Sequence, residues 1–140
     1  MSLKSIAALL FAKHATRQIN KWASTPVQTQ ERVFKQLIST AKNTAFGKDH
    51  DFDKITTHQD FIQNVPIRDY EALRSYVDRV VAGEKDILWP GKPLYFAKTS
   101  GTTSGAKYIP LTKESMPTHI KAARNAILCY INQTKKAAFV

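Results

Sequence analysis

The sequence has one cysteine, Cys129, among its 140 residues. A single cysteine excludes a disulfide within the chain and a metal site built from several thiolates. Long apolar runs are also missing, because no stretch approaches the roughly 20 apolar residues that a membrane-spanning helix needs. The short apolar run at residues 6–12 is followed by Lys13 and Arg17 rather than by a small-residue cleavage site. We therefore expect no signal peptide, no membrane partner and a cytoplasmic protein.

Acidic residues are scarce, since 11 Asp and Glu stand against 21 Lys and Arg, which gives a net charge of +10. The excess is uneven: residues 1–48 and 98–140 are basic, and residues 49–97 are slightly acidic. A nucleic-acid-binding protein usually concentrates its basic residues on one element, whereas here they are spread over two predicted helices near the N-terminus. We therefore expect no nucleic-acid partner. On charge alone, a non-catalytic basic helical module that binds nucleic acid or an anionic membrane remains the alternative.

Residues with metal-ligand chemistry are present, but their spacing does not suit a metal site. The four histidines are far apart along the chain: His14, His50, His58 and His119. The acidic segment "KDHDFD" at residues 48–53 lacks the glycine and the final glutamate of a calcium-binding loop. No metal site is predicted from these residues.

Apolar residues recur at helical spacing along most of the first 82 residues and again near the end of the chain. Residues three and four apart share one face of a helix, so this pattern predicts helices. The predicted helices are Ser5–Trp22, Pro26–Ala41, Thr57–Ile62, Tyr70–Val81 and Ser115–Gln133. Their predicted N-caps are Thr25, Thr57 and Asp69, and their predicted stops are Gly47, Pro66 and Gly83.

The same spacing predicts which side chains face inward. In the first helix these are Ile6, Leu9, Leu10, Ile19 and Trp22. In the helix that begins at Tyr70 they are Tyr70, Leu73, Val77, Val80 and Val81. In the last helix they are Ile120, Ala123, Ile127, Leu128 and Ile131.

The hydrophobic period changes near residue 87, where alternation typical of strands begins. We expect a short strand at Ile87–Trp89 and two further strands, at about 94–98 and 107–111, that pair as a β-hairpin. The sequence therefore predicts an α+β fold: a mostly helical N-terminal segment, a β-hairpin and a further helix.

The segment "KTSGTTSGAKYIP" at residues 98–110, which includes the loop between the hairpin strands, holds two of the five glycines and many small hydroxyl side chains. It is not a P-loop, because three residues rather than four separate Gly101 from Gly105 and Tyr108 stands where serine or threonine should bind magnesium. Unhindered amides, hydroxyls and a nearby ammonium group can still bind a polyphosphate. A polar hairpin loop without any ligand is the other interpretation of the same residues.

Residues Thr99–Thr103 followed by Lys107 resemble the nucleotide-phosphate loop of adenylate-forming enzymes, a superfamily that includes the acyl-CoA synthetases. Residues 104–106 differ from the usual Gly-x-Pro, which argues against a general acyl-CoA synthetase. Two longer stretches, residues 30–52 and 61–112, resemble a narrower branch: the auxin-responsive Gretchen Hagen family of acyl-acid amido synthetases, in its bacterial form. The resemblance covers roughly residues 25 to 130.

That resemblance implies an enzyme that uses ATP to adenylate a carboxylic acid and then transfers the acyl group to an amine or amino acid. It implies a phosphate-binding loop made of Thr99, Ser100, Gly101, Thr102, Thr103, Ser104, Gly105 and Lys107. The hydroxyls and amides would donate hydrogen bonds, the glycines would let the loop fold over the nucleotide, and Lys107 would add a positive charge. Mg²⁺ is expected with the nucleotide, although its ligands cannot be identified in this sequence.

Members of that family are several times longer than this chain. The resemblance therefore implies that residues 1–140 are the N-terminal part of a single ATP-binding, adenylating domain within a larger α/β architecture. The acyl pocket, the other nucleotide motifs and a C-terminal domain would lie beyond Val140.

Overall fold

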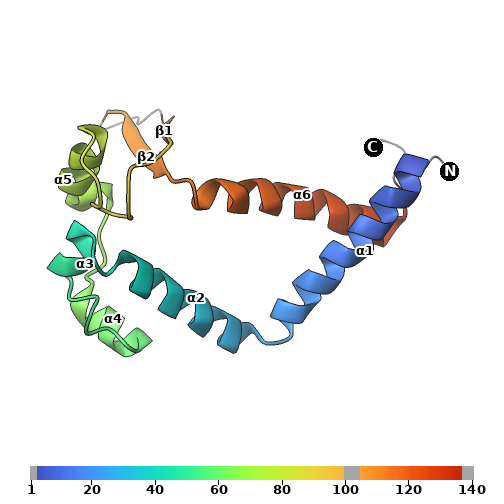
Figure 1. Ribbon diagram of the computed structural model, residues 1–140, viewed down its shortest axis with the longest axis horizontal. Helices are drawn as coiled ribbons and strands as arrows, with labels where there is room; N and C mark the ends of the chain where they lie inside the picture. The colour runs from blue at the N-terminus through green and yellow to red at the C-terminus, as the bar shows by residue number, and fades with distance from the viewer. Residues whose placement is uncertain (1–2, 100–104, 137–140) are drawn as a thin grey trace. The chain divides into compact units, whose positions relative to one another are not determined.

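The computed structural model describes residues 3–99 and 105–136 and is mostly helical, with a two-stranded antiparallel sheet (Figure 1). In chain order the elements are α1 (Leu3–Ala23), α2 (Pro26–Ala41), α3 (Ala45–Asp49), α4 (His58–Asn64), α5 (Tyr70–Val81), β1 (Tyr95–Thr99), β2 (Lys107–Leu111) and α6 (Ser115–Thr134). The predicted α+β class is confirmed: in chain order, a helical segment is followed by a β-hairpin and then by a further helix. In the described part of the chain, no helix is both long and apolar enough to span a bilayer.

The chain divides into two compact units. The first is Met1–Gln30 together with Glu114–Val140, and the second is Glu31–Lys113. The unit boundary falls within α2.

In the first unit, α1 and α6 lie side by side (Figure 1). Their seam is built from Ala8, Ala12 and Ile131, all almost fully buried, with Leu9 and Leu128 packed against them. Two alanines one helical turn apart leave little side-chain volume on α1, so the backbone of α6 can approach closely. The seam is therefore apolar and depends on small residues.

The predicted apolar stripe of α1 is only partly correct. Leu9 packs at the seam, but Ile6, Leu10 and Trp22 are exposed. The residues that are buried, Ala8 and Ala12, were not predicted, because alanine carries little weight in a hydrophobic pattern. On α6 the prediction holds for Leu128 and Ile131 and is wrong for these residues, which are exposed: Ile120, Ala123 and Ile127.

The second unit has an aromatic-rich core. Ile38, Ala41, Phe52 and Ile55 are buried, and the partly buried residues around them are Phe34, Phe46, Phe61, Val65 and Trp89. Edge-to-face ring contacts join Phe34 to Phe61 and Phe46 to Phe52, with centroids 5.8 and 5.9 Å apart. This core therefore joins α2 to the chain segments that follow it, through Phe61 of α4.

On α5, the predicted inward positions are largely confirmed. Val77 and Val80 are buried, and Tyr70 and Leu73 are partly buried. Val81, at the last position of the helix, is exposed, which differs from the prediction.

Helix caps are the part of the fold that local sequence predicts best. The Thr57 hydroxyl accepts a hydrogen bond from the Asp60 amide, and Asp60 Oδ2 accepts one from the Thr57 amide, which makes a capping box. Asp69 Oδ1 accepts from the Ala72 amide at the start of α5. Gly83 follows α5 with a φ of 90°, a left-handed conformation that glycine adopts without strain. These three signals are confirmed.

Gly47 was predicted to stop the helix that begins at Pro26, and this is wrong. α2 already ends at Ala41, and Gly47 lies inside α3, a short helix that was not predicted. A Cβ atom at Gly47 would lie 2.2 Å from the Ala41 carbonyl oxygen, so a side chain here would collide with backbone. The glycine is therefore required by the close approach of α3 to the end of α2.

The predicted strand at Ile87–Trp89 is absent from the described structure, where this segment is a series of bends. Its backbone is used differently: the carbonyl oxygens of Asp86 and Ile87 accept hydrogen bonds from the amides of Ala45 and Phe46, at 2.8 and 3.0 Å. These are the first two amides of α3, which have no partner within their own helix. The segment therefore caps α3 rather than joining the sheet.

β1 and β2 form the predicted hairpin, with bounds within one residue of those expected. In the antiparallel register, Tyr95 lies opposite Leu111 and Thr99 lies opposite Lys107. The hairpin contacts α5 through β2. This contact places one end of the predicted phosphate loop against a helix.

Candidate functional site

The hairpin brings together the two ends of the predicted phosphate loop. Thr99 is the last residue of β1, and it lies opposite Lys107, the first residue of β2. Side chains of directly opposed residues in an antiparallel pair project from the same face of the sheet. The Thr99 hydroxyl and the Lys107 ammonium group are therefore on one face of the hairpin, at the end from which the loop leaves.

Gly105 stands two residues before β2 with a φ of 80°. Nothing lies within 4 Å of the place where a Cβ atom would be, so space does not demand glycine. The positive φ does favour it, because residues with a side chain are strained in this conformation. The other predicted loop residues lie outside the described part of the chain: Ser100, Gly101, Thr102, Thr103 and Ser104.

Two lysines flank the loop, and each ammonium group lies over a tyrosine ring. Lys107 Nζ is 5.3 Å from the centroid of Tyr70, and Lys98 Nζ is 5.9 Å from that of Tyr108. The face of an aromatic ring attracts a cation at these distances. Lys98 lies opposite Tyr108 in the register, so it projects from the other face of the hairpin. Only Lys107 shares the face of Thr99.

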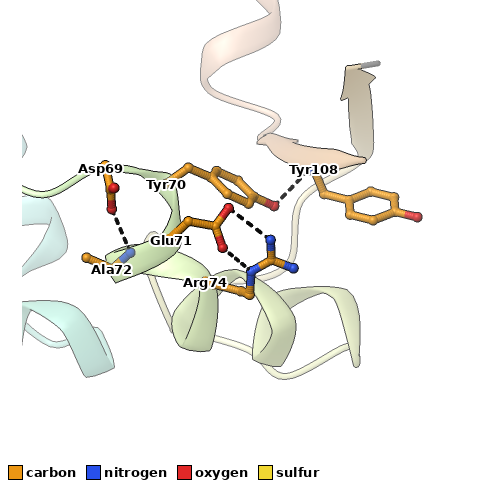
Figure 2. Close-up of polar contacts among 6 residues, drawn as sticks. All are labelled: Asp69, Tyr70, Glu71, Ala72, Arg74 and Tyr108. Carbon is orange, nitrogen blue, oxygen red and sulfur yellow. Dashed lines mark hydrogen bonds and ion pairs between the residues drawn. The ribbon is translucent and has the colours of Figure 1, made fainter. Parts of the chain in front are cut away.

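Tyr70 also makes a hydrogen bond to the hairpin. The backbone amide of Tyr108 donates to the Tyr70 hydroxyl oxygen at 2.9 Å, as Figure 2 shows. Tyr70 is the first residue of α5 and follows its N-cap, Asp69. The cap anchors the helix end that carries Tyr70, and Tyr70 in turn anchors β2.

A second cation lies near the Tyr70 ring. The guanidinium carbon of Arg74 is 5.7 Å from the ring centroid. Arg74 is itself held by two hydrogen bonds to the Glu71 carboxylate, at 2.7 and 2.9 Å (Figure 2). The carboxylate raises the pKa of Arg74 above its usual value through these bonds and through its charge. Tyr70 is thus near Arg74 on its own helix and Lys107 on the hairpin.

The role of Tyr70 was missed from the sequence, where it was predicted only as a core residue. It lies 38 residues before its hydrogen-bond partner, Tyr108. No periodicity or motif links two positions at that separation, so the contact follows from the tertiary fold alone.

A cleft elsewhere in the second unit contains none of the described loop residues. It has a volume of about 340 Å³ and lies between α2 and residues 52–56. Its lining combines apolar side chains with Lys35, Lys42 and Asp53. Lys35 is already paired with Glu31 at 2.7 Å. The hairpin end is therefore the better candidate site, since predicted residues converge there.

Side chains able to form a metal site do not cluster in residues 3–99 or 105–136, where no group of three or more His, Cys, Asp or Glu residues comes together.

A scan against protein-family models matches residues 15–139 to the N-terminal domain of the GH3 family. The match includes all the hairpin residues described above. It also includes α2 to α6 and the C-terminal part of α1.

Similar proteins are found among plant enzymes. The chain is 35% identical over 95 residues to indole-3-acetic acid-amido synthetase GH3.15 of Arabidopsis thaliana. This match covers 66% of the chain and 16% of that protein. It is 28% identical over 117 residues to synthetase GH3.2 of the same plant, covering 82% of this chain and 20% of the relative. It is 29% identical over 92 residues to the Arabidopsis 4-substituted benzoates-glutamate ligase GH3.12. This match covers 65% of this chain and 16% of the relative. The chain thus spans at most about a fifth of the length of these relatives.

Proposed function

This chain belongs to the GH3 family, and we propose that it is the N-terminal part of an ATP-dependent ligase that joins a carboxylic acid to an amine or amino acid. The family match confirms the resemblance to acyl-acid amido synthetases. The assignment of this chain to a bacterial form of the family and to the adenylate-forming superfamily remains a prediction. The relatives are named as synthetases or ligases of indole-3-acetic acid and of 4-substituted benzoates, which makes aromatic acids reasonable first substrates to test.

The proposed reaction has two steps. An oxygen of the acid's carboxylate attacks the α-phosphorus of ATP, the bond from that phosphorus to the pyrophosphate oxygen breaks, and an acyl-adenylate forms. The amine nitrogen then attacks the acyl carbon, the bond from that carbon to the AMP oxygen breaks, and the nitrogen loses a proton to water. The first step makes a good leaving group out of a carboxylate, which otherwise has none.

The observation that carries the proposal is the convergence of Thr99 and Lys107 at one end of the hairpin. Negative charge grows on pyrophosphate as it leaves, and donors fixed in advance around it stabilise the transition state. The Lys107 ammonium group would supply a positive charge, and the Thr99 hydroxyl a hydrogen bond on the same face. Gly105 would let the chain turn back towards β2, since its φ is already positive.

The remaining loop residues would complete the phosphate site. Ser100, Thr102, Thr103 and Ser104 would donate from hydroxyls or amides, and Gly101 would allow the nucleotide to approach the backbone. Mg²⁺ is expected to accompany ATP, where it would neutralise part of the phosphate charge.

Pyrophosphate release by the full-length protein tests the proposal. We expect release that requires both ATP and an acid, measured over a panel that includes indole-3-acetic acid and 4-substituted benzoates. Absence of acid-dependent release with every acid would contradict the ligase. Salt-dependent retention on DNA or on anionic vesicles, unaffected by ATP, would then favour the basic binding module.

A further inference from the structure

Tyr70 makes two contacts with the first two residues of β2. Its hydroxyl oxygen accepts the Tyr108 amide at 2.9 Å, and its ring lies 5.3 Å from Lys107 Nζ. We propose that Tyr70 is a positioning residue for nucleotide binding, which holds the start of β2, and with it the Lys107 ammonium group, in the place where the phosphates bind. This inference rests on the proposed function.

The hydrogen bond acts on the backbone of β2. The amide of Tyr108 donates to a side chain on α5, so the strand is held from outside the hairpin as well as by its pairing with β1. A two-stranded hairpin is marginally stable by itself and needs packing against another element to keep its position. Tyr70 is such an attachment, and it acts one residue after Lys107.

The ring contact acts on the lysine side chain. Lysine has four rotatable bonds, and a freely rotating ammonium group loses conformational entropy when it binds a phosphate. Attraction to the Tyr70 ring keeps the ammonium group near the face shared with Thr99 before the nucleotide arrives. Part of the ordering cost is therefore met in the free protein, which favours binding.

Tyr70 is itself held in place from α5. Asp69 caps the helix through the Ala72 amide at 2.9 Å, and the Arg74 guanidinium group lies over the Tyr70 ring while it is bound to Glu71. Figure 2 shows these groups together around the first turn of the helix. The arrangement connects a rigid helix end to the strand that begins with Lys107.

Another tyrosine on α5 provides a matched control. The Tyr76 hydroxyl donates to Asp49 Oδ2 at 2.7 Å, and the Tyr76 ring contacts Phe46 edge to face. Tyr76→Phe removes a tyrosine hydroxyl from the same helix, as Tyr70→Phe does, but that hydroxyl interacts with Asp49 of α3 and with Arg68, neither of which is on the hairpin. The pair of variants separates a loss of position at β2 from a general loss of stability.

The experiment uses the full-length enzyme and measures the Kd for ATP with magnesium by calorimetry, the KM values for ATP and acid, and the melting temperature. For Tyr70→Phe we expect the Kd and KM for ATP to rise about three- to thirtyfold, because the partly buried Tyr108 amide loses its acceptor and β2 loses an attachment. The KM for the acid should stay within about twofold, which is under 0.5 kcal/mol in binding free energy. Tyr76→Phe should lower the melting temperature without changing ATP affinity.

A double-mutant cycle with Lys107→Met tests whether Tyr70 acts through the lysine. We expect Tyr70→Phe to weaken ATP binding less in the Lys107→Met background than in the wild type. Equal effects in both backgrounds, or equal ATP affinity for Tyr70→Phe and Tyr76→Phe, would overturn the inference. Wild-type protein that neither binds ATP nor releases pyrophosphate would instead overturn the proposed function, so the two failures are distinguishable.

Discussion

The seam between α1 and α6 and the contact between α5 and β2 are built from different kinds of interaction. At the seam, Ala8, Ala12 and Ile131 are almost fully buried among apolar neighbours. At the second contact, partly buried Tyr70 meets β2 through one hydrogen bond and one cation–π contact. The first contact excludes water, and the second directs particular atoms.

The first kind of contact mainly stabilises the fold, and the second mainly determines where individual groups lie. Burial of apolar surface stabilises a fold without specifying the direction of any single group. A hydrogen bond from one backbone amide to a tyrosine hydroxyl contributes little net free energy but determines where that amide lies. We therefore expect changes at the seam to alter the free energy of unfolding, and changes at the hairpin to alter nucleotide binding and activity.

The largest effect is expected from changing Thr102 and Thr103 together to valine in the full-length enzyme. Valine keeps the branched shape and removes both hydroxyl donors. Loss of one or two bonds to phosphate, at ~1.5–3 kcal/mol each, would slow acid-dependent pyrophosphate release by about ten- to ten-thousandfold. The free energy of unfolding should change by only about 0.5 kcal/mol. Full activity in this variant would mean that the loop is only a turn.

At the seam, Ile131→Ala should reduce the free energy of unfolding by about 2–5 kcal/mol, because Ile131 is almost fully buried between the helices and its loss leaves a cavity. Ile131→Val should cost about 0.5–1.5 kcal/mol at the same position. Urea unfolding of the full-length protein measures both. ATP affinity should be unchanged in either variant. A clear change in ATP affinity would contradict the expectation that the seam affects stability and the hairpin affects nucleotide binding.

A smaller effect is expected at the cap of α4. Thr57→Ala removes the hydroxyl that accepts the Asp60 amide and should cost about 1 kcal/mol in the free energy of unfolding. Thr57→Ser keeps the acceptor and serves as the control. A thermal melt of the two variants should place Thr57→Ser close to the wild type, and similar losses in both would argue against the cap.

The smallest effect concerns pH. Hydrogen bonds from the backbone amides of Thr56 and Thr57, and then from their hydroxyls, hold the pKa of the Asp60 carboxyl at about 2, below its ordinary 3.8. Because the pKa is lowered in the folded state, the carboxylate stabilises the fold above pH 3.8, and this contribution is lost as the pH falls through about 2. The stability difference between wild type and Asp60→Ala should be constant near neutral pH and shrink below about pH 4. A difference that grows on acidification would contradict this sign.

Features that depend on a few neighbouring residues could be predicted from the sequence. Thr57, Asp69 and Gly83 mark helix ends because their side chains or backbone angles act within one turn. The alternation in residues 94–111 likewise predicted a hairpin that formed with nearly the expected bounds. For the same reason, Thr99, Gly105 and Lys107 could be located at the hairpin end before the structure was known.

Features that depend on distant partners could not be predicted. Residues 87–89 are consecutive apolar residues that resemble a short strand, yet the carbonyls of residues 86 and 87 accept hydrogen bonds from the amides of α3. Gly47 resembles a helix stop, but its real constraint is the Ala41 carbonyl against which it packs. Each error comes from a contact between segments that local pattern treats as independent.

The sequence by itself determined the helix ends, the hairpin and the place of its loop, because turn chemistry and hydrophobic period act over a few residues. Only the tertiary structure decided that Ala8 and Ala12, rather than Ile6 and Trp22, are buried at the seam with α6, since close packing selects small residues where two helices approach. Only the tertiary structure placed the Tyr70 hydroxyl on the Tyr108 amide, 38 residues away, because that contact requires α5 and β2 to be folded against each other.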